Sequence, residues 1–303
     1  MTIDLSNHMA RAALVRRMYA DLDGACKDMF REDPRKHLGA SVIGDDCQAK
    51  AWLAFRWVHF EEFDGRMLRL FNRGHEEEHR FVRWLRGMDF EVWELDPATN
   101  KQFRIKGAKG HFGGSLDAIF RAPPRYDLDQ DLLGEFKTHS ENSFTKLAGP
   151  KLSPGQNGPT AYRTGGKGVK LSKPQHFRQM CSYGRAYGFK YAVYCAVNKN
   201  TDEIYFEIVE LDWSQADDLF RKAEGIVFSQ TMPPRIAQAK TFSDCRICKL
   251  AEHCHDGRMP AKNCRSCKLA FPVEDGQWLC QPRGQVIPDE VIKVGCPSWS
   301  RII

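Results

Sequence analysis

The sequence has 303 residues, of which 42% are hydrophobic and 28% charged, with a formal net charge of +6. This apolar fraction is enough for a packed core, so the composition excludes a disordered chain. The charge is only mildly basic, and it neither requires nor excludes an anionic partner. No run of about 18 apolar residues occurs, and the N-terminus lacks a basic stretch followed by an apolar one. We therefore expect a cytoplasmic protein that does not associate with membranes.

Helical spacing of apolar residues predicts three helices in the first third of the chain. The predicted helices cover residues 8–32, 46–64 and about 66–86. At 100° per residue, Gly74, Glu78 and Phe81 fall on one stripe of the third helix. Glu78 is therefore expected to point to the same side as the apolar residues.

Short strands separated by Pro, Gly and Asp follow, and we expect them to form an antiparallel meander. They are DFEVWEL at 89–95, KQFRI at 101–105, GSLDAIF at 114–120 and LLGEFKT at 132–138. The segment 149–168 is rich in Gly, Pro and Lys, which predicts a long loop. The remaining predicted elements are a helix from about 172 to 188, strands at 191–197 and 203–211, and a helix near 213–225.

Charged residues interrupt two of these predicted strands. Glu135 and Lys137 are separated by Phe136, so both project from one face of their strand, and Asp117 can approach them from an earlier strand. Two carboxylates gathered in this way favour a divalent cation between them, and oxygen ligands suit Mg²⁺ or Mn²⁺. Glu78 is a candidate third carboxylate. A structural salt bridge between Lys137 and one acid is the alternative interpretation.

These motifs, in this order, resemble the PD-(D/E)XK nuclease superfamily, particularly its RecB-like branch, over roughly residues 40–255. Asp117, Glu135 and Lys137 match the signature of that family. The resemblance implies an α/β fold with a restriction-endonuclease-like core, in which helices flank a central mixed sheet. A small cysteine-rich, metal-binding C-terminal appendage would follow this core.

Two helical motifs extend the resemblance. Gly74 and Glu78 resemble the first motif of the family, a helix Gly followed four residues later by a metal-binding Glu or His. RecB has a His in this motif, and His79 is also present here, but the apolar stripe favours Glu78. Gln179 and Tyr183 resemble the Q-x-x-x-Y motif.

The resemblance implies roles for the residues of the signature. Asp117, Glu135 and the carbonyl of Phe136 would hold Mg²⁺ or Mn²⁺, with Glu78 as a further ligand. The metal would polarise the scissile phosphate and lower the pKa of the attacking water. Lys137 would orient that water and offset the charge that develops on the phosphate.

Further residues are expected near the substrate. By the same resemblance, Gln179 would orient the metal-bound water or a nearby phosphate, while Tyr183 would stack on a base or pack beneath the site. In the predicted loop, the basic residues Arg163, Lys167 and Lys170 could follow a phosphate backbone. A solvated loop without a ligand is an equal alternative.

Seven of the eleven cysteines follow residue 244. Cys245, Cys248 and Cys254 have C-x2-C-x5-C spacing, and such clustered thiolates bind zinc or an iron–sulfur cluster, which spacing cannot distinguish. Iron–sulfur members of the RecB-like branch, of the AddB and CRISPR-associated types, combine three such cysteines with one that precedes the core. Cys47 resembles that first cysteine. The resemblance implies a 4Fe-4S cluster that closes a loop of roughly two hundred residues.

The last cysteines form a second set that suits a closed tetrahedral zinc site. Its members are Cys264, Cys267, Cys280 and Cys296. Alternatively, Cys280 and Cys296 are ordinary buried thiols, and His253 or His255 replaces either as a ligand.

The sequence thus predicts four regions and one activity. The regions are an N-terminal helical region at 1–65 with Cys47, a nuclease core at 66–240, an iron–sulfur clasp at 241–258 and a zinc-binding tail at 259–303. We expect a metal-dependent exonuclease that acts on single- or double-stranded DNA in recombination, repair or end processing. A phage origin, and a recombination or single-strand-binding partner, are compatible with this activity. A non-catalytic nucleic-acid-binding metalloprotein scaffold and a CRISPR adaptation nuclease are the alternatives.

Overall fold

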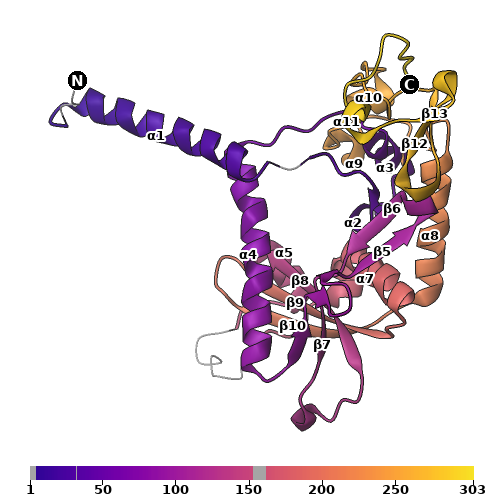
Figure 1. Ribbon diagram of the computed structural model, residues 1–303. Helices are drawn as coiled ribbons and strands as arrows, with labels where there is room; N and C mark the ends of the chain where they lie inside the picture. Colours follow the sequence, from indigo (N-terminus) through magenta and orange to yellow (C-terminus); the bar gives the residue numbers. More distant parts are fainter. Residues whose placement is uncertain (1–4, 32, 153–161) are drawn as a thin grey trace.

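A five-stranded mixed sheet lies at the centre of the computed structural model, which describes residues 5–31, 33–152 and 162–303 (Figure 1). Its strands, in spatial order, are β10 (Ile204–Glu210), β9 (Tyr191–Asn198), β8 (Asp131–His139), β7 (Ala118–Arg121) and β2 (Glu91–Trp93). β8 and β9 are parallel, and the other neighbours are antiparallel. With helices on both sides of this sheet, the protein is a mixed α/β fold, as the sequence predicts.

The two faces of the sheet contribute to different cores because successive side chains alternate. Leu133 packs into a large cluster with helix α7 (Pro174–Tyr187) and helix α8 (Trp213–Phe228). Leu132 and Phe136 pack into a smaller cluster with helix α4 (Gly65–Gly87). Glu135 and Lys137 lie two and four residues after Leu133, so their side chains project from the same face of the sheet, which faces α7.

Helix α4 confirms the helix predicted for about 66–86. Asp64 caps its start, because its side chain accepts a hydrogen bond from the backbone N–H of Met67 at 2.7 Å. The ring of Phe81 stacks on that of Phe136 with centroids 5.3 Å apart. This contact fixes α4 against the strand that carries the predicted catalytic residues.

The second predicted helix is shorter than expected. Instead of covering 46–64, it consists of α3 (Gln48–Phe55), and the chain is irregular from there to Asp64. Trp57 has a positive φ of 49°, which L-residues rarely adopt and which a continuing helix does not allow. The helix therefore ends before this turn.

The predicted antiparallel meander is divided among three sheets. The segment GSLDAIF forms two strands, β6 (Phe112–Ser115) and β7, with Asp117 in the break between them. β6 belongs to a separate three-stranded sheet with β1 (Leu38–Gly39) and β5 (Arg104–Gly107). A two-stranded sheet, β3 (Leu95–Asp96) and β4 (Lys101–Gln102), precedes it. The prediction of one continuous strand is therefore wrong, because the chain passes from one sheet to another at Asp117.

The later predicted elements agree with the structure. β9, β10, α7 and α8 occupy the ranges expected from apolar periodicity. Two shorter helices, α5 (Glu141–Ala148) and α6 (Gly168–Ser172), flank the predicted loop at 149–168. Within that loop, residues 153–161 lie outside the described residues.

The C-terminal region packs against α3. It contains α9 (Ser243–Arg246), α10 (Ala251–His255), α11 (Asp289–Ile292) and a sheet of β11 (Ala270–Pro272), β12 (Trp278–Cys280) and β13 (Gln285–Val286). Arg56, which follows α3, is buried and donates to the carbonyl of Cys267 at 2.8 Å. The buried guanidinium of Arg265 lies 4.2 Å from the ring centroid of Trp57. These contacts join residues near the two ends of the chain.

The first helix, α1 (His8–Met29), extends away from the rest of the protein and contacts mainly the start of α4 (Figure 1). The backbone N–H of Gly65 donates to Asp23 Oδ1 at 2.5 Å at this contact. Among the helices of the described ranges, none combines the length and apolar character needed to cross a membrane.

Candidate active site

The fold brings together the three residues of the predicted signature. The antiparallel register of β7 and β8 places Asp117 beside Glu135. Lys137 Nζ lies 2.6 Å from Glu135 Oε1 and 3.5 Å from Asp117 Oδ2. Asp117 Oδ2 also accepts a hydrogen bond from the backbone N–H of Phe136 at 2.8 Å. Two carboxylates and one ammonium therefore form one cluster beside β8.

The electrostatics of this group depend on burial. Glu135 is fully buried, and its Oε2 has no hydrogen-bond partner within the described ranges. Burial raises the pKa of Glu135, Lys137 opposes this rise, and Asp117 and Glu78 add to it. Burial alone would lower the pKa of Lys137, but Asp117 and Glu135 outweigh it and raise this pKa well above its usual value. Lys137 is therefore a cation at neutral pH.

Glu78 reaches this group from α4. Burial, followed by the negative charge of Asp117, raises the pKa of Glu78 to about 7. In contrast, His79 is 67% exposed and its Nδ1 lies 3.5 Å from Glu94 Oε2, away from the other acids. The geometry therefore favours Glu78 over His79 as the acid of the predicted first motif.

The predicted Q-x-x-x-Y pair lies beneath the site. Gln179 and Tyr183 are buried on α7, and Gln179 Nε2 donates to Tyr183 Oη at 3.1 Å. A Cβ atom at Gly114 would lie only 2.6 Å from Tyr183 Oη, so the tyrosine packs directly against β6. Because Tyr183 is 2% exposed, it is not available to stack on a base. The prediction that Tyr183 binds DNA is corrected to packing beneath the site.

A cavity of about 350 Å³ opens beside Lys137. Its lining comprises Gly74, Glu78, Phe136, Lys137, Thr138, His139, Ser143, Lys173 and His176. The sequence does not point to Ser143 or His176, because they come from different elements and have no ligand spacing. One residue of the cavity can be inferred from the sequence: His139 lies two residues after Lys137 and therefore on the same face of β8.

Five side chains form a continuous series of hydrogen bonds beside this cavity, in which Tyr194 of β9 joins the two histidines. The successive contacts are Lys173 Nζ to Ser143 Oγ at 2.6 Å, Ser143 Oγ to His139 Nδ1 at 3.2 Å, His139 Nε2 to Tyr194 Oη at 2.8 Å, and Tyr194 Oη to His176 Nδ1 at 2.7 Å. Burial lowers the pKa of His139 to about 4 and that of His176 to about 3. Both imidazoles are therefore neutral at pH 7.

The donor and the acceptor in each of these hydrogen bonds follow from Lys173, at one end of the series. The Lys173 ammonium can only donate, so Ser143 directs its own hydrogen to His139 Nδ1. His139 then carries its proton on Nε2 and donates to Tyr194, whose hydroxyl donates to His176 Nδ1. The one remaining imidazole proton of His176 is consequently on Nε2. No protein partner of this nitrogen occurs in the described parts of the chain, and His176 lines the same cavity as Glu78 and Lys137.

Arg163 does not have the exposed position expected for a DNA contact. Its side chain is 2% exposed, and the guanidinium lies between Glu141 Oε1 at 2.9 Å and Glu203 Oε2 at 2.5 Å. The prediction for Arg163 is therefore corrected to a structural ion pair that anchors the end of the loop. Lys167 and Lys170 are exposed and remain available to a polyanion.

Replacing Arg163 with Ala is expected to lower the free energy of unfolding by about 3 kcal/mol, because the substitution leaves two acids without their buried partner. Chemical denaturation measures this change. Lys167→Ala, in the same segment, is the matched control and should stay within about 0.5 kcal/mol of wild type. Equal stability of both variants would show that the ion pair does not anchor the loop.

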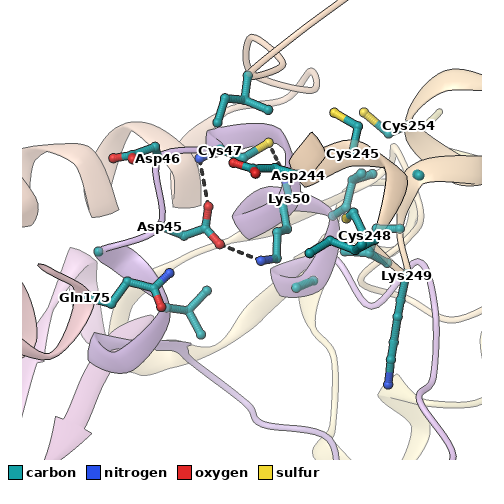
Figure 2. Close-up of a pocket in the computed structure, with 18 of the residues that line it drawn as sticks. Asp45, Asp46, Cys47, Lys50, Gln175, Asp244, Cys245, Cys248, Lys249 and Cys254 are labelled. Carbon is teal, nitrogen blue, oxygen red and sulfur yellow. Dashed lines mark hydrogen bonds and ion pairs between the residues drawn. The ribbon is translucent and has the colours of Figure 1, made fainter. Parts of the chain in front are cut away.

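The first predicted cysteine set lines one large cavity, of about 890 Å³, which contains Cys47, Cys245, Cys248 and Cys254. Cys47 precedes α3 and accepts a hydrogen bond from the backbone N–H of Lys50 at 3.4 Å. Figure 2 shows Cys47 facing the short helices that carry Cys245 and Cys254. Burial, then the neighbouring thiols of Cys47 and Cys248, raises the pKa of Cys245. Residues about two hundred positions apart thus meet in one place.

The second predicted set also converges. Cys264, Cys280 and Cys296 line a cavity of about 360 Å³. Burial raises the pKa of Cys264, with smaller contributions from Cys296, Cys267 and Cys280. The fourth predicted member, Cys267, is buried next to this cavity.

Donor spacing across these sites is wider than a bound metal requires. Within the described ranges, no group of three or more His, Cys, Asp or Glu side chains is close enough to hold a metal ion as it stands. The donor types nevertheless suit cations, since a buried carboxylate oxygen without a partner is costly to leave uncompensated and cysteine thiolates are the ligands of zinc and iron–sulfur centres.

No protein-family model and no curated protein matches this chain. Among solved structures, SSO0001 is similar with a TM-score of 0.44 and 13% identity, over 78% of this chain and 94% of that one. LHK-Exo in complex with dAMP is similar with a TM-score of 0.39 and 14% identity, over 63% of this chain and 86% of that one. The alkaline exonuclease LHK-Exo from Laribacter hongkongensis is similar with a TM-score of 0.37 and 15% identity, over 68% of this chain and 90% of that one. Because these TM-scores lie below 0.5, we base the functional proposal on the site itself.

Proposed function

We propose that this chain is a metal-dependent deoxyribonuclease that hydrolyses phosphodiester bonds, acting as an exonuclease in recombination, repair or DNA end processing. The observation that supports it best is the meeting of Asp117, Glu135 and Lys137 beside a solvent-accessible cavity. Lys137 remains charged there, and Glu135 keeps an oxygen without a partner. A salt bridge with a purely structural role would not leave a buried carboxylate oxygen unsatisfied.

Mg²⁺ or Mn²⁺ would be held by Asp117, Glu135 and the carbonyl of Phe136, with Glu78 from the facing helix. Burial raises the pKa of Glu78 and of Glu135, the charge of Asp117 adds to both shifts, and a divalent cation would stabilise the ionised acids. When bound, the metal would polarise the scissile phosphate and lower the pKa of water.

The protein side chains supply the remaining interactions. Lys137 places a fixed positive charge where the phosphate accumulates negative charge, and it can orient the attacking water. His176 donates from Nε2 to a phosphate oxygen in the cavity. Gln179 is buried behind the carboxylates and, with Tyr183, positions the floor of the site. Lys167 and Lys170 attract the DNA backbone.

The proposal is tested with end-labelled single- and double-stranded DNA incubated with the purified full chain and Mg²⁺ or Mn²⁺. Release of labelled mononucleotides that stops when EDTA is added supports an exonuclease. Internal fragments would identify an endonuclease instead. Intact substrates in every metal, with folded protein, would contradict a nuclease function for these substrates.

Two substitutions of His176 separate its two nitrogens. His176→Asn keeps an acceptor for Tyr194 but removes the donor that faces the cavity, so we expect cleavage to fall about 10²-fold. His176→Gln restores a donor at the position of Nε2 and should stay within about tenfold of wild type. Single-turnover cleavage rates at saturating metal measure both. Equal activity of His176→Asn and wild type would exclude a contact between His176 and the substrate.

We also propose that the two cysteine sets bind different centres. Cys47, Cys245, Cys248 and Cys254 would hold a 4Fe-4S cluster between the N-terminal helices and the C-terminal region. The second set, Cys264, Cys267, Cys280 and Cys296, would hold zinc in the tail. Four thiols converge in each case, and clustered thiolates are the ligands that both centres require.

A further inference from the structure

Helix α1 carries an apolar stripe that the rest of the protein leaves exposed. Val15 is 48% exposed, Met18 61%, Tyr19 71% and Leu22 46%. Spacings of three and four residues place these side chains on one face of the helix. Figure 1 shows that this part of α1 stands clear of the sheet and of the other helices. In soluble proteins, a stripe of this kind marks an interaction surface.

The charges of α1 run against its own dipole. The N-terminal half contains Arg11, Arg16 and Arg17 and no acid, while the C-terminal half contains three aspartates and one lysine. A helix has a partial positive charge at its N-terminus and a partial negative charge at its C-terminus, so an isolated helix favours the opposite arrangement. Within the described ranges, no ion pair compensates for this unfavourable arrangement at Arg16, Arg17, Asp21 or Asp28.

An antiparallel second copy of α1 corrects both features. We propose that the protein forms a homodimer in which two α1 helices pack antiparallel along the stripe from Val15 to Leu22. The basic half of each helix then faces the acidic half of its partner, and the two helix dipoles oppose each other. Parallel packing would place basic against basic and acidic against acidic. The charge pattern therefore selects a second copy in one orientation.

The anchoring of α1 is compatible with this arrangement. Among the described residues, the contacts that fix α1 to the protein lie at its C-terminal end, where Asp23 accepts from Gly65 and Arg69 donates to the thiol of buried Cys26. The residues of the stripe lie N-terminal to Cys26, and their side chains are exposed. Pairing through them requires no other part of the fold to move.

Sedimentation equilibrium of the full chain tests the proposal. Wild type should dimerise at micromolar concentration, and Leu22→Asp should raise the dissociation constant at least about a hundredfold, because it places a charge in the apolar stripe. A Lys101→Asp/Lys106→Asp variant, changed in exposed strand residues far from α1, is the control and should dimerise like wild type. A monomeric wild type would overturn the proposal, as would a Leu22→Asp variant that dimerises normally.

A pair of charge variants tests the orientation even if Leu22→Asp unfolds α1. Arg16→Asp/Arg17→Asp makes both halves of the helix acidic, and Asp21→Arg/Asp28→Arg makes both halves basic. Each variant alone should be monomeric because like charges meet. Mixed in equal amounts, the two should form a heterodimer, since acidic and basic halves face each other at both ends. Two variants that dimerise alone, or a mixture that stays monomeric, would overturn the antiparallel pairing.

Discussion

Lys137→Ala is expected to lower the rate of DNA cleavage about 10³-fold at saturating metal, because it removes the only ammonium found within 4 Å of both Asp117 and Glu135 among the described residues. The loss should appear in the single-turnover rate rather than in DNA affinity, since Lys137 acts where charge develops during the reaction. Single-turnover rates over a range of enzyme concentrations separate the two quantities.

Lys170→Ala is the matched control for this substitution. Lys170 is an exposed lysine outside the carboxylate group, so its loss should weaken DNA binding slightly and leave the saturated rate nearly unchanged. Thermal denaturation of both variants confirms that they are folded. If Lys137→Ala cleaves DNA in a metal-dependent way at the wild-type rate, the reaction occurs elsewhere on the protein.

Cys245→Ser/Cys248→Ser is expected to have the largest effect on stability. It removes two of the four thiols in the cavity that joins α3 to the C-terminal region, so anaerobically purified protein should lose its iron and the visible absorption of the cluster. Opening a loop of roughly two hundred residues restores conformational freedom to the unfolded chain, and we expect the free energy of unfolding to fall by about 4 kcal/mol. Iron analysis and denaturation measure the two effects.

Substitutions in the second cysteine set distinguish the two centres. Cys264→Ser/Cys267→Ser should remove about one zinc per chain and leave the iron content unchanged. Cys26→Ala, at a buried thiol outside both sets, should change neither metal. Wild-type protein that contains no iron after anaerobic purification would contradict the proposed cluster. If that protein contained two zinc ions per chain, zinc would be assigned to both cysteine sets.

The long periodic elements could be predicted from the sequence because their own residues determine them. The apolar stripe of α4 and the continuous apolar runs of β8 and β9 are buried as the sequence predicts, so local pattern and tertiary structure agree. The end of α3 depends instead on the positive φ of Trp57, for which the sequence has no Gly or Pro signal. The break at Asp117 arises because two different sheets share one segment, which alternation cannot reveal.

The candidate site shows the same division. The parity of Glu135 and Lys137 on one strand was enough to place both on one face. The positions of Ser143, Lys173 and His176 depend on how α5 and α7 pack around Tyr194, and no spacing encodes that. Arg163 was misassigned because a basic residue in a Gly-rich loop looks exposed, whereas its partners Glu141 and Glu203 lie 22 and 40 residues away.

The dependence of cleavage on Mg²⁺ concentration tests the central claim most directly, with wild type beside Glu78→Gln. We expect no cleavage in EDTA, a wild-type rate that saturates with Mg²⁺, and a half-saturating concentration about tenfold higher in Glu78→Gln, because one carboxylate has been removed from the cation site. Cleavage that persists in EDTA, or none at any Mg²⁺ concentration, would contradict a metal-dependent nuclease centre at Asp117, Glu135 and Lys137. An identical Mg²⁺ dependence in both proteins would exclude Glu78 from that centre.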